Sequence, residues 1–228
     1  MIVSNAYGTI QDSVFYNSGQ LGGNPSWFLS LAISGSKWRI LNNKFLDDQT
    51  IHTQNYCIYL TEGAFDCDIK NNYFENWRYQ CVSPTSRNNI QQNRGFIAPG
   101  ESRSASGRLT AGNANAIAFA WHNPELQDIL IKKVTIRITT PGGTAGSLLD
   151  VGIADDAAGT NRGTEFFDDV DLNTAAIVKS TIATPGTQTV EVFCQDSVSA
   201  TDGWIVGQIL VENAASLVGS YYIEYEGA

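Results

Sequence analysis

Charged side chains are scarce in this chain, and cationic ones are scarcer still. Asp, Glu, Lys and Arg make up 16% of the 228 residues, with 14 Lys and Arg against 23 Asp and Glu, so that the net charge is −9. Binding to a nucleic-acid backbone requires clustered cations. The composition therefore argues against nucleic acid as a partner.

Long helical and long apolar patterns are also missing. The best helical candidate, residues 123–131, is short and carries Pro124 near its start. No apolar run approaches the roughly 18 residues of a membrane span, and the first residues do not resemble a signal peptide. We therefore predict an all-β protein without membrane insertion.

The residues that usually mark metal sites and nucleophiles are few. The four cysteines show no C-x-x-C spacing and no accompanying histidine cluster, which argues against zinc and predicts buried free thiols: Cys57, Cys67, Cys81 and Cys194. The two histidines, His52 and His122, lie in different parts of the chain, and no nucleophile elbow, phosphate loop or H-E-x-x-H motif occurs. No catalytic residue can be assigned from the sequence.

What the chain does contain is an internal repeat. Four segments share an apolar residue, a polar pair that is often Asn-Asn, and an aromatic residue: 10–15, 40–45, 69–74 and the degenerate 90–96. Asn tolerates the left-handed conformation of a sharp corner, and stacked Asn side chains can hydrogen-bond from one coil to the next. The flanking Ile and Phe should point inward and stack on their equivalents.

These I-x-N-N-x-F segments resemble the coils of right-handed parallel β-helices of the pectate-lyase type, which also form the body of many phage tail spikes. The resemblance covers residues 1–96 and implies that they are terminal coils of such a β-helix. Because the pattern is already under way at residue 1 without a capping repeat, we expect further coils upstream in a longer protein. A set of β-meander strands that matches by coincidence is the alternative.

Beyond the coils the pattern changes to antiparallel strands. Residues 97–106 are small and polar, which is typical of a connector. Residues 107–228 alternate apolar and polar positions with a period of two, and turn signals such as Pro141-Gly142 and Asp202-Gly203 separate the runs. This pattern predicts a β-sandwich, most simply a jelly roll.

The sandwich region is similar to a module found at the C-terminal ends of phage structural proteins. The similar segments are Gly107 to Ile117, Leu149 to Ile153, Asp169 to Asn173 and Ala215 to Ile223. The likeness implies a role in the virion and brings no catalytic residues with it.

A sugar-binding surface is predicted in the coils. Register places Asp48 and Trp77 at neighbouring positions in successive coils, with Arg78 beside them. An indole can stack on a sugar ring while charged groups contact its hydroxyls or carboxylates. The alternative is that Trp77 covers a corner of the coil and the acids are solvated.

A calcium site is predicted in two loops of the sandwich. Calcium takes several oxygen ligands from flexible loops, and five acids concentrate there: Asp155, Asp156, Asp168, Asp169 and Asp171. Their spacing matches no EF-hand, and a solvated acidic rim is the alternative. No other cofactor is expected.

The sequence thus predicts the distal region of a phage tail spike or fibre that forms a homotrimer and binds a host-surface polysaccharide. Such a protein would be located in the virion and act outside the cell. One alternative is a fragment of a capsule or lipopolysaccharide depolymerase, because polysaccharide cleavage on β-helices commonly uses two carboxylates. A second alternative is a carbohydrate-binding module of a secreted polysaccharide-degrading protein.

Overall fold

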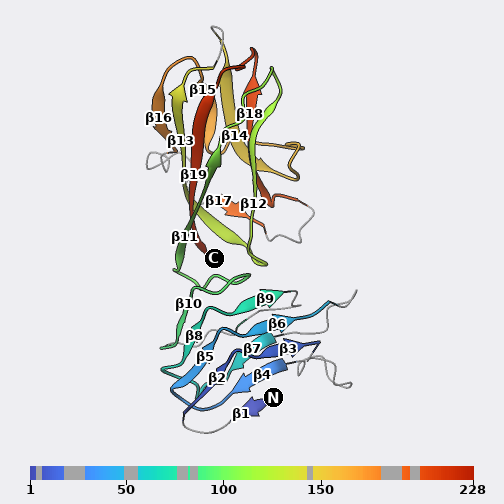
Figure 1. The fold of residues 1–228 in the computed structure, drawn as a ribbon, viewed down its shortest axis with the longest axis vertical. Coiled ribbons are helices and arrows are strands. Elements are labelled where there is room, and N and C mark those ends of the chain that lie inside the picture. The colour runs from blue at the N-terminus through green and yellow to red at the C-terminus, as the bar shows by residue number, and fades with distance from the viewer. Residues whose placement is uncertain are drawn as a thin grey trace. The chain divides into compact units, whose positions relative to one another are not determined.

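The protein is described by a computed structural model that covers residues 1–3, 7–17, 29–48, 56–75, 82, 87–142, 146–180, 192–195 and 201–228. Every regular element within these residues is a β-strand, which confirms the all-β prediction (Figure 1). None of the described residues forms a helix with the length and apolar character needed to cross a bilayer. The chain divides into two compact units, Met1–Ala98 and Pro99–Ala228.

The described strands of the first unit form three sheets in which all neighbours are parallel (Figure 1). One sheet has the order β1-β4-β7, with strands Ile2–Val3, Leu29–Ile33 and Tyr56–Leu60. A second has the order β10-β8-β5-β2, with strands Asn89–Gln91, Asp68–Lys70, Trp38–Leu41 and Gly8–Gln11. The third has the order β3-β6-β9, with strands Val14–Tyr16, Lys44–Leu46 and Tyr73–Glu75.

Equivalent residues of successive repeats are paired, as the repeat predicts. The four isoleucines align in one ladder: Ile10, Ile40, Ile69 and Ile90. Phe45 stacks between Phe15 and Phe74, with ring centroids 4.6 and 5.1 Å apart. Because the Ile and Phe ladders lie in the same buried cluster, each repeat buries its apolar residues against the next one.

The corner between the isoleucine and the aromatic residue has a left-handed backbone. The residue at this corner has a φ of 52 to 58° in all four repeats: Asp12, Asn42, Asn71 and Gln92. Asn pays little for this conformation, which explains why it occupies two of the four positions.

The residue after each corner faces inward and forms a hydrogen-bonded ladder. The side-chain Oδ1 of Asn43, Asn72 and Asn93 accepts a hydrogen bond from the backbone N–H one repeat earlier, at 2.9 to 3.0 Å. Their Nδ2 groups donate to isoleucine carbonyls of an earlier repeat, at 2.9 to 3.0 Å. All three amides are fully buried and satisfied, so the predicted coil-to-coil Asn contacts are confirmed.

The degenerate fourth repeat differs because of a glycine. Gly95 follows Arg94, which is bridged to Tyr73, so Gly95 stands where the earlier repeats have their aromatic residue. A Cβ at Gly95 would lie 2.3 Å from the carbonyl oxygen of Phe74, and its φ is +83°. Phe96, one residue later, instead contacts the Phe74 ring edge-on at 6.3 Å.

The described strands of the second unit form two antiparallel sheets (Figure 1). The first has the order β11-β19-β13-β16, with β17 also on β13; the strands are Ser102–Arg108, Val218–Gly227, Ile129–Thr140, Ala176–Lys179 and Val192–Cys194. The second has the order β12-β18-β14-β15, with strands Ile117–His122, Trp204–Leu210, Leu148–Ala154 and Phe167–Asp171.

Aromatic side chains join the two sheets of this unit. Phe119 on β12 stacks on Tyr221 of β19 at 4.3 Å, and Trp121 lies 5.3 Å from Tyr225. Phe119 and Trp121 therefore share a face, as their spacing predicts. Three cysteines of the chain, Cys57, Cys67 and Cys194, are buried free thiols as expected, whereas Cys81 lies outside the described residues.

Part of the predicted connector is a strand. Residues 102–106, which composition assigns to a connector, form most of β11 and pair with β19. Along β11 exposed side chains alternate with half-buried ones. Because Ser, Ala and Gly occupy most of these positions, the period-two pattern carries little hydrophobic contrast and resembles a loop in the sequence.

Candidate functional site

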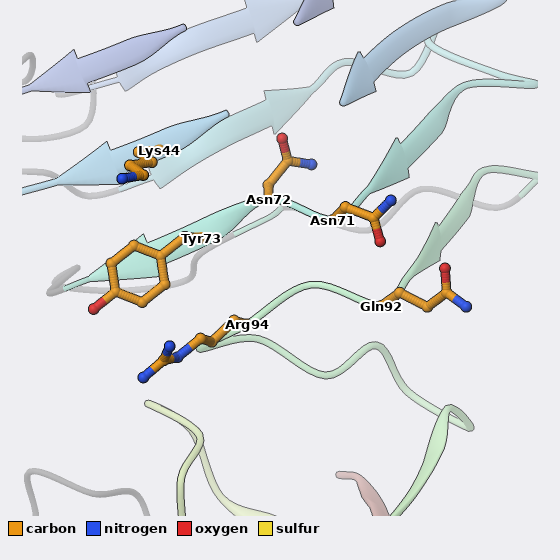
Figure 2. Close-up of a pocket in the computed structure, with 6 residues that line it drawn as sticks. All are labelled: Lys44, Asn71, Asn72, Tyr73, Gln92 and Arg94. Carbon is orange, nitrogen blue, oxygen red and sulfur yellow. The ribbon is translucent and has the colours of Figure 1, made fainter. Parts of the chain in front are cut away.

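An open groove of about 470 Å³ lies on the first unit, along sheet β3-β6-β9 and the corner that precedes it. Its lining residues are Lys44, Asn71, Asn72, Tyr73, Gln92 and Arg94 (Figure 2). Lys44 and Arg94 are exposed and Tyr73 is half-buried. The groove is therefore accessible to a ligand, and one residue of the Asn ladder, Asn72, is among its lining residues.

The repeat itself places the groove side chains. Each of Lys44, Tyr73 and Arg94 directly follows an inward-facing Asn, and successive side chains of a strand point to opposite faces. Lys44 pairs with Tyr73, and Tyr73 with Arg94. Figure 2 shows the three side chains projecting on the same side from successive levels. With neighbouring strands about 4.8 Å apart, Lys44 and Arg94 originate roughly 10 Å from each other.

The backbone beneath this row is fixed by hydrogen bonds between repeats. The N–H groups of Lys44, Tyr73 and Arg94 donate to carbonyl oxygens of other repeats at 2.8 to 2.9 Å. The row is thus presented by regular structure, which limits the entropy lost when a ligand binds.

Positive charge dominates the groove. Its lining contains two cations and no carboxylate. Other cations of this unit are paired, Lys70 with Asp68 at 3.0 Å and Arg87 with Asp66 at 3.3 Å. Neither Lys44 nor Arg94 has such a partner within the described part of the chain.

Tyr73 orients the cation beside it. The Arg94 guanidinium carbon lies 5.2 Å from the centroid of the Tyr73 ring, a cation–π contact. Burial raises the pKa of the Tyr73 hydroxyl, Glu75 raises it further through its charge and a hydrogen bond, and Arg94 acts in the opposite direction. Tyr73 is therefore a neutral phenol that supports Arg94 on one side and contacts Glu75 on the other.

Of the three residues in the sugar site predicted from the sequence, only Asp48 lies among the described residues. Trp77 and Arg78 lie outside the described residues. Asp48 is exposed and accepts hydrogen bonds from the hydroxyl of Tyr16 and, at 2.7 Å, from the Nδ2 of Asn17. These two donors hold the pKa of Asp48 below its ordinary value. Asp48 thus joins two successive repeats in the described structure, and its part in sugar binding stays a prediction.

The groove residues were missed by sequence reasoning, although a signal for them exists. Lys44, Tyr73 and Arg94 occupy the same place in three repeats, directly after the inward-facing Asn. Reading the variable position of the motif as an outward column would have grouped them. The sequence prediction relied on a tryptophan and carboxylates and therefore placed the sugar surface at Trp77, Arg78 and Asp48.

Two of the five predicted calcium ligands, Asp156 and Asp171, hold turns in their own loops, and Asp155 also accepts a hydrogen bond from the backbone N–H of Asp202 at 3.2 Å. Asp156 accepts hydrogen bonds from two backbone N–H groups and the hydroxyl of Thr160, at 2.7 to 3.0 Å. Asp171 accepts similar bonds from the two residues that follow Leu172, and Asp155 from the side chain of Asn161. These hydrogen bonds hold the pKa of both carboxyls below the ordinary value. The largest contribution comes from the backbone N–H of Thr160 for Asp156 and from the backbone N–H of Asn173 for Asp171.

The other two predicted ligands join a third carboxylate. Asp168 and Asp169 lie with the buried Asp150, each with an oxygen within 4.8 Å of the others. Asp150, which the sequence reasoning did not include, also accepts a hydrogen bond from the backbone N–H of Asp169 at 2.8 Å and pairs with Arg162 at 3.4 Å. The Arg162 guanidinium already supplies positive charge to Asp150, which argues against a calcium ion at this position. Calcium binding by Asp168 and Asp169 stays a prediction.

Comparisons with known proteins give weak neighbours. No protein-family model matches the sequence, and no curated protein matches it either. The capsid of Ralstonia phage GP4 is 16% identical over 57% of this chain and 88% of that one, with a TM-score of 0.38. The capsid of cyanophage Pam1 is 18% identical over 57% of this chain and 86% of that one, with a TM-score of 0.33.

The third neighbour is the tailspike protein of Acinetobacter phage vB_ApiP_P1. It is 8% identical, and the match covers all of this chain and 55% of the tailspike chain at a TM-score of 0.23. All three neighbours are phage structural proteins, but likenesses at these TM-scores carry no argument about fold or function.

Proposed function

We propose that this chain is the distal region of a phage tail spike or fibre, located in the virion, that binds a glycan of the host surface. In this proposal the first unit forms the last coils of a right-handed parallel β-helix, and the second is a jelly-roll-like β-sandwich. The observation that carries glycan binding is the open groove on the stacked repeats, where Lys44, Tyr73 and Arg94 form one outward row.

The chemistry of the groove supports a sugar ligand. An aromatic ring flanked by charged groups can contact both the apolar face and the polar substituents of a sugar. Asn71 adds an exposed amide, which can donate to and accept from hydroxyls. Single-site affinity should be weak, with a Kd of about 0.1–1 mM.

Electrostatics favour binding over hydrolysis. A glycosidase needs one carboxylic acid with a raised pKa that can protonate the leaving group. In the first unit, the pKa of Asp68 is held low by Lys70 and Asn89, and that of Asp48 by Tyr16 and Asn17. Asp48 and Asp68 are thus poor proton donors near neutral pH, which argues against these two residues as the general acid of a depolymerase.

The proposal includes a homotrimer, and we expect light scattering to give a mass of three 24.8 kDa chains at micromolar concentration. Large side chains on the first unit are strongly exposed, among them Ile2 and Tyr7 at 80 and 76%. Lateral association of three chains would bury such residues, and obligate interfaces exceed about 2,000 Å². A concentration-independent mass of one chain would contradict the trimer and favour the alternative of a carbohydrate-binding module.

Glycan binding is tested with a panel of purified bacterial capsular and lipopolysaccharide glycans. We expect the chain to retain at least one of them without shortening it, because the groove offers cations and an aromatic ring for binding and no carboxylate among its lining residues. Steady release of reducing ends would instead support the depolymerase. A Trp77→Ala variant in the same assay tests the sugar surface predicted at Trp77, Arg78 and Asp48.

A further inference from the structure

We infer that the groove is specific for an anionic glycan, whose carboxylate or phosphate substituents bind Lys44 and Arg94. The inference rests on the proposed function and names the class of its ligand. It starts from a contrast: the chain carries a net charge of −9, yet this groove gathers two cations and no acid among its lining residues. Among the described residues neither cation has a carboxylate partner, and a neutral sugar would not supply one.

Arg94 is prepared for a planar anion. Its guanidinium lies over the Tyr73 ring, so the contact restrains its orientation before any ligand arrives. The N–H donors of a guanidinium lie in its plane, and they match carboxylate and phosphate oxygens in a two-point geometry. Because the Tyr73 ring restrains the guanidinium, less side-chain entropy remains to be lost on binding.

Lys44 gives the groove a second point of contact. It lies two levels from Arg94 on the same row, with Tyr73 between them (Figure 2). Its flexible ammonium can bind a second anionic substituent. An acidic polysaccharide repeats its charge along the chain, so it can engage both cations, whereas a single free anion can satisfy only one end.

Exposure sets the strength of these contacts. Both cations are solvated, so each contributes modestly and added salt weakens it. The two charge contacts together distinguish an acidic glycan from an uncharged one. Loss of both contacts should reduce the affinity for the acidic glycan about tenfold or more. Three copies in a trimer would raise the avidity on a cell surface without changing the specificity of each groove.

The test uses the full chain and the glycan panel in low salt, with each bound glycan compared to its uncharged derivative. Carboxylates are reduced to alcohols, and phosphate groups are removed with hydrofluoric acid, so the two treatments distinguish the two anions. We expect acidic glycans to bind, and the treatment that removes their charge to raise Kd at least tenfold. A derivative that binds as well as its parent would overturn this inference while leaving glycan binding intact.

Variants locate the effect. Lys44→Met together with Arg94→Gln should raise the Kd of the acidic glycan at least tenfold and raise the Kd of the uncharged derivative by a much smaller factor. Lys70→Met removes the same type of charge from a cation already paired with Asp68, and should change Kd less than twofold. Tyr73→Ala removes the ring beneath Arg94 and should weaken binding of the acidic glycan.

Two results would contradict the assignment. Equal weakening by Lys70→Met and by the variant that combines Lys44→Met with Arg94→Gln would mean that overall charge, not the groove, controls binding. An acidic glycan that binds the groove variants as well as the parent would place the site elsewhere. If no glycan of the panel binds, the proposed function itself fails, and the inference fails with it.

Discussion

Replacing Arg103 with Met should lower the free energy of unfolding of the second unit by about 3–5 kcal/mol at pH 7.5, because it leaves a buried carboxylate without its partner. Arg103 lies 2.6 Å from Oε1 of Glu125 and 3.1 Å from Oε1 of Glu101. Glu125 is only 2% exposed, and its Oε2 has no hydrogen-bond partner among the described residues. The Arg103 guanidinium is therefore the main compensation for the buried charge.

The loss should depend on pH. Burial raises the pKa of Glu125 above its ordinary 4.5, and Arg103 opposes this rise. A carboxyl whose pKa is higher in the folded state binds more protons there, so stability falls as pH increases between the unfolded and the folded pKa. Removing Arg103 raises the folded pKa further. The deficit of the variant should thus be smaller at pH 5 than at pH 8, measured by urea unfolding.

An exposed ion pair provides the control. Lys133 pairs with Glu224 at the surface of the same sheet, so Lys133→Met should cost no more than about 1 kcal/mol. If both variants lose the same stability, or if the Arg103→Met deficit is independent of pH, the buried carboxylate is not the cause.

Replacing Asn72 with Ala should cost the first unit about 3–5 kcal/mol, because two buried backbone groups lose their hydrogen bonds. Asn72 Nδ2 donates to the carbonyl of Ile40 at 2.9 Å, and Asn72 Oδ1 accepts from the N–H of Asn43 at 2.9 Å. Water cannot replace the side chain at a position that is 1% exposed. Thermal and urea unfolding of the variant would measure the loss.

The neighbouring corner residue is the matched control for this ladder. Asn71 is exposed and has a φ of 56°, a conformation that Gly adopts without strain, so Asn71→Gly should change stability by less than about 1 kcal/mol. A loss of similar size in both variants would mean that the corner backbone, and not the buried amide ladder, holds the repeats together.

The sequence was most informative where a position has one physical role in every repeat. The inward Ile and Phe and the buried Asn are constrained by burial and by hydrogen bonds between repeats, so their letters recur and their register could be predicted. Gly95 breaks the pattern because Phe74 approaches too closely for a side chain. Strand β11 was not predicted because most of its residues are small, so apolar and polar positions do not alternate visibly in its sequence.

The site was harder to predict, because outward positions are free to vary. Lys44, Tyr73 and Arg94 share no residue type, and only the stacking of the repeats makes them neighbours. The acidic loops show the opposite problem: five aspartates look alike in the sequence, yet Asp156 and Asp171 hold turns, whereas Asp168 and Asp169 lie beside Asp150. Local hydrogen bonds, which no sequence pattern displays, separate these roles.

The most direct test is to label the chain with a fluorophore and to measure its adsorption to bacterial cells. These cells carry the acidic polysaccharide that the chain binds in the glycan panel. The account predicts saturable binding to these cells, at least tenfold weaker binding by the variant that combines Lys44→Met with Arg94→Gln, and no binding to isogenic cells that lack the polysaccharide. Equal adsorption to cells with and without the polysaccharide would contradict it.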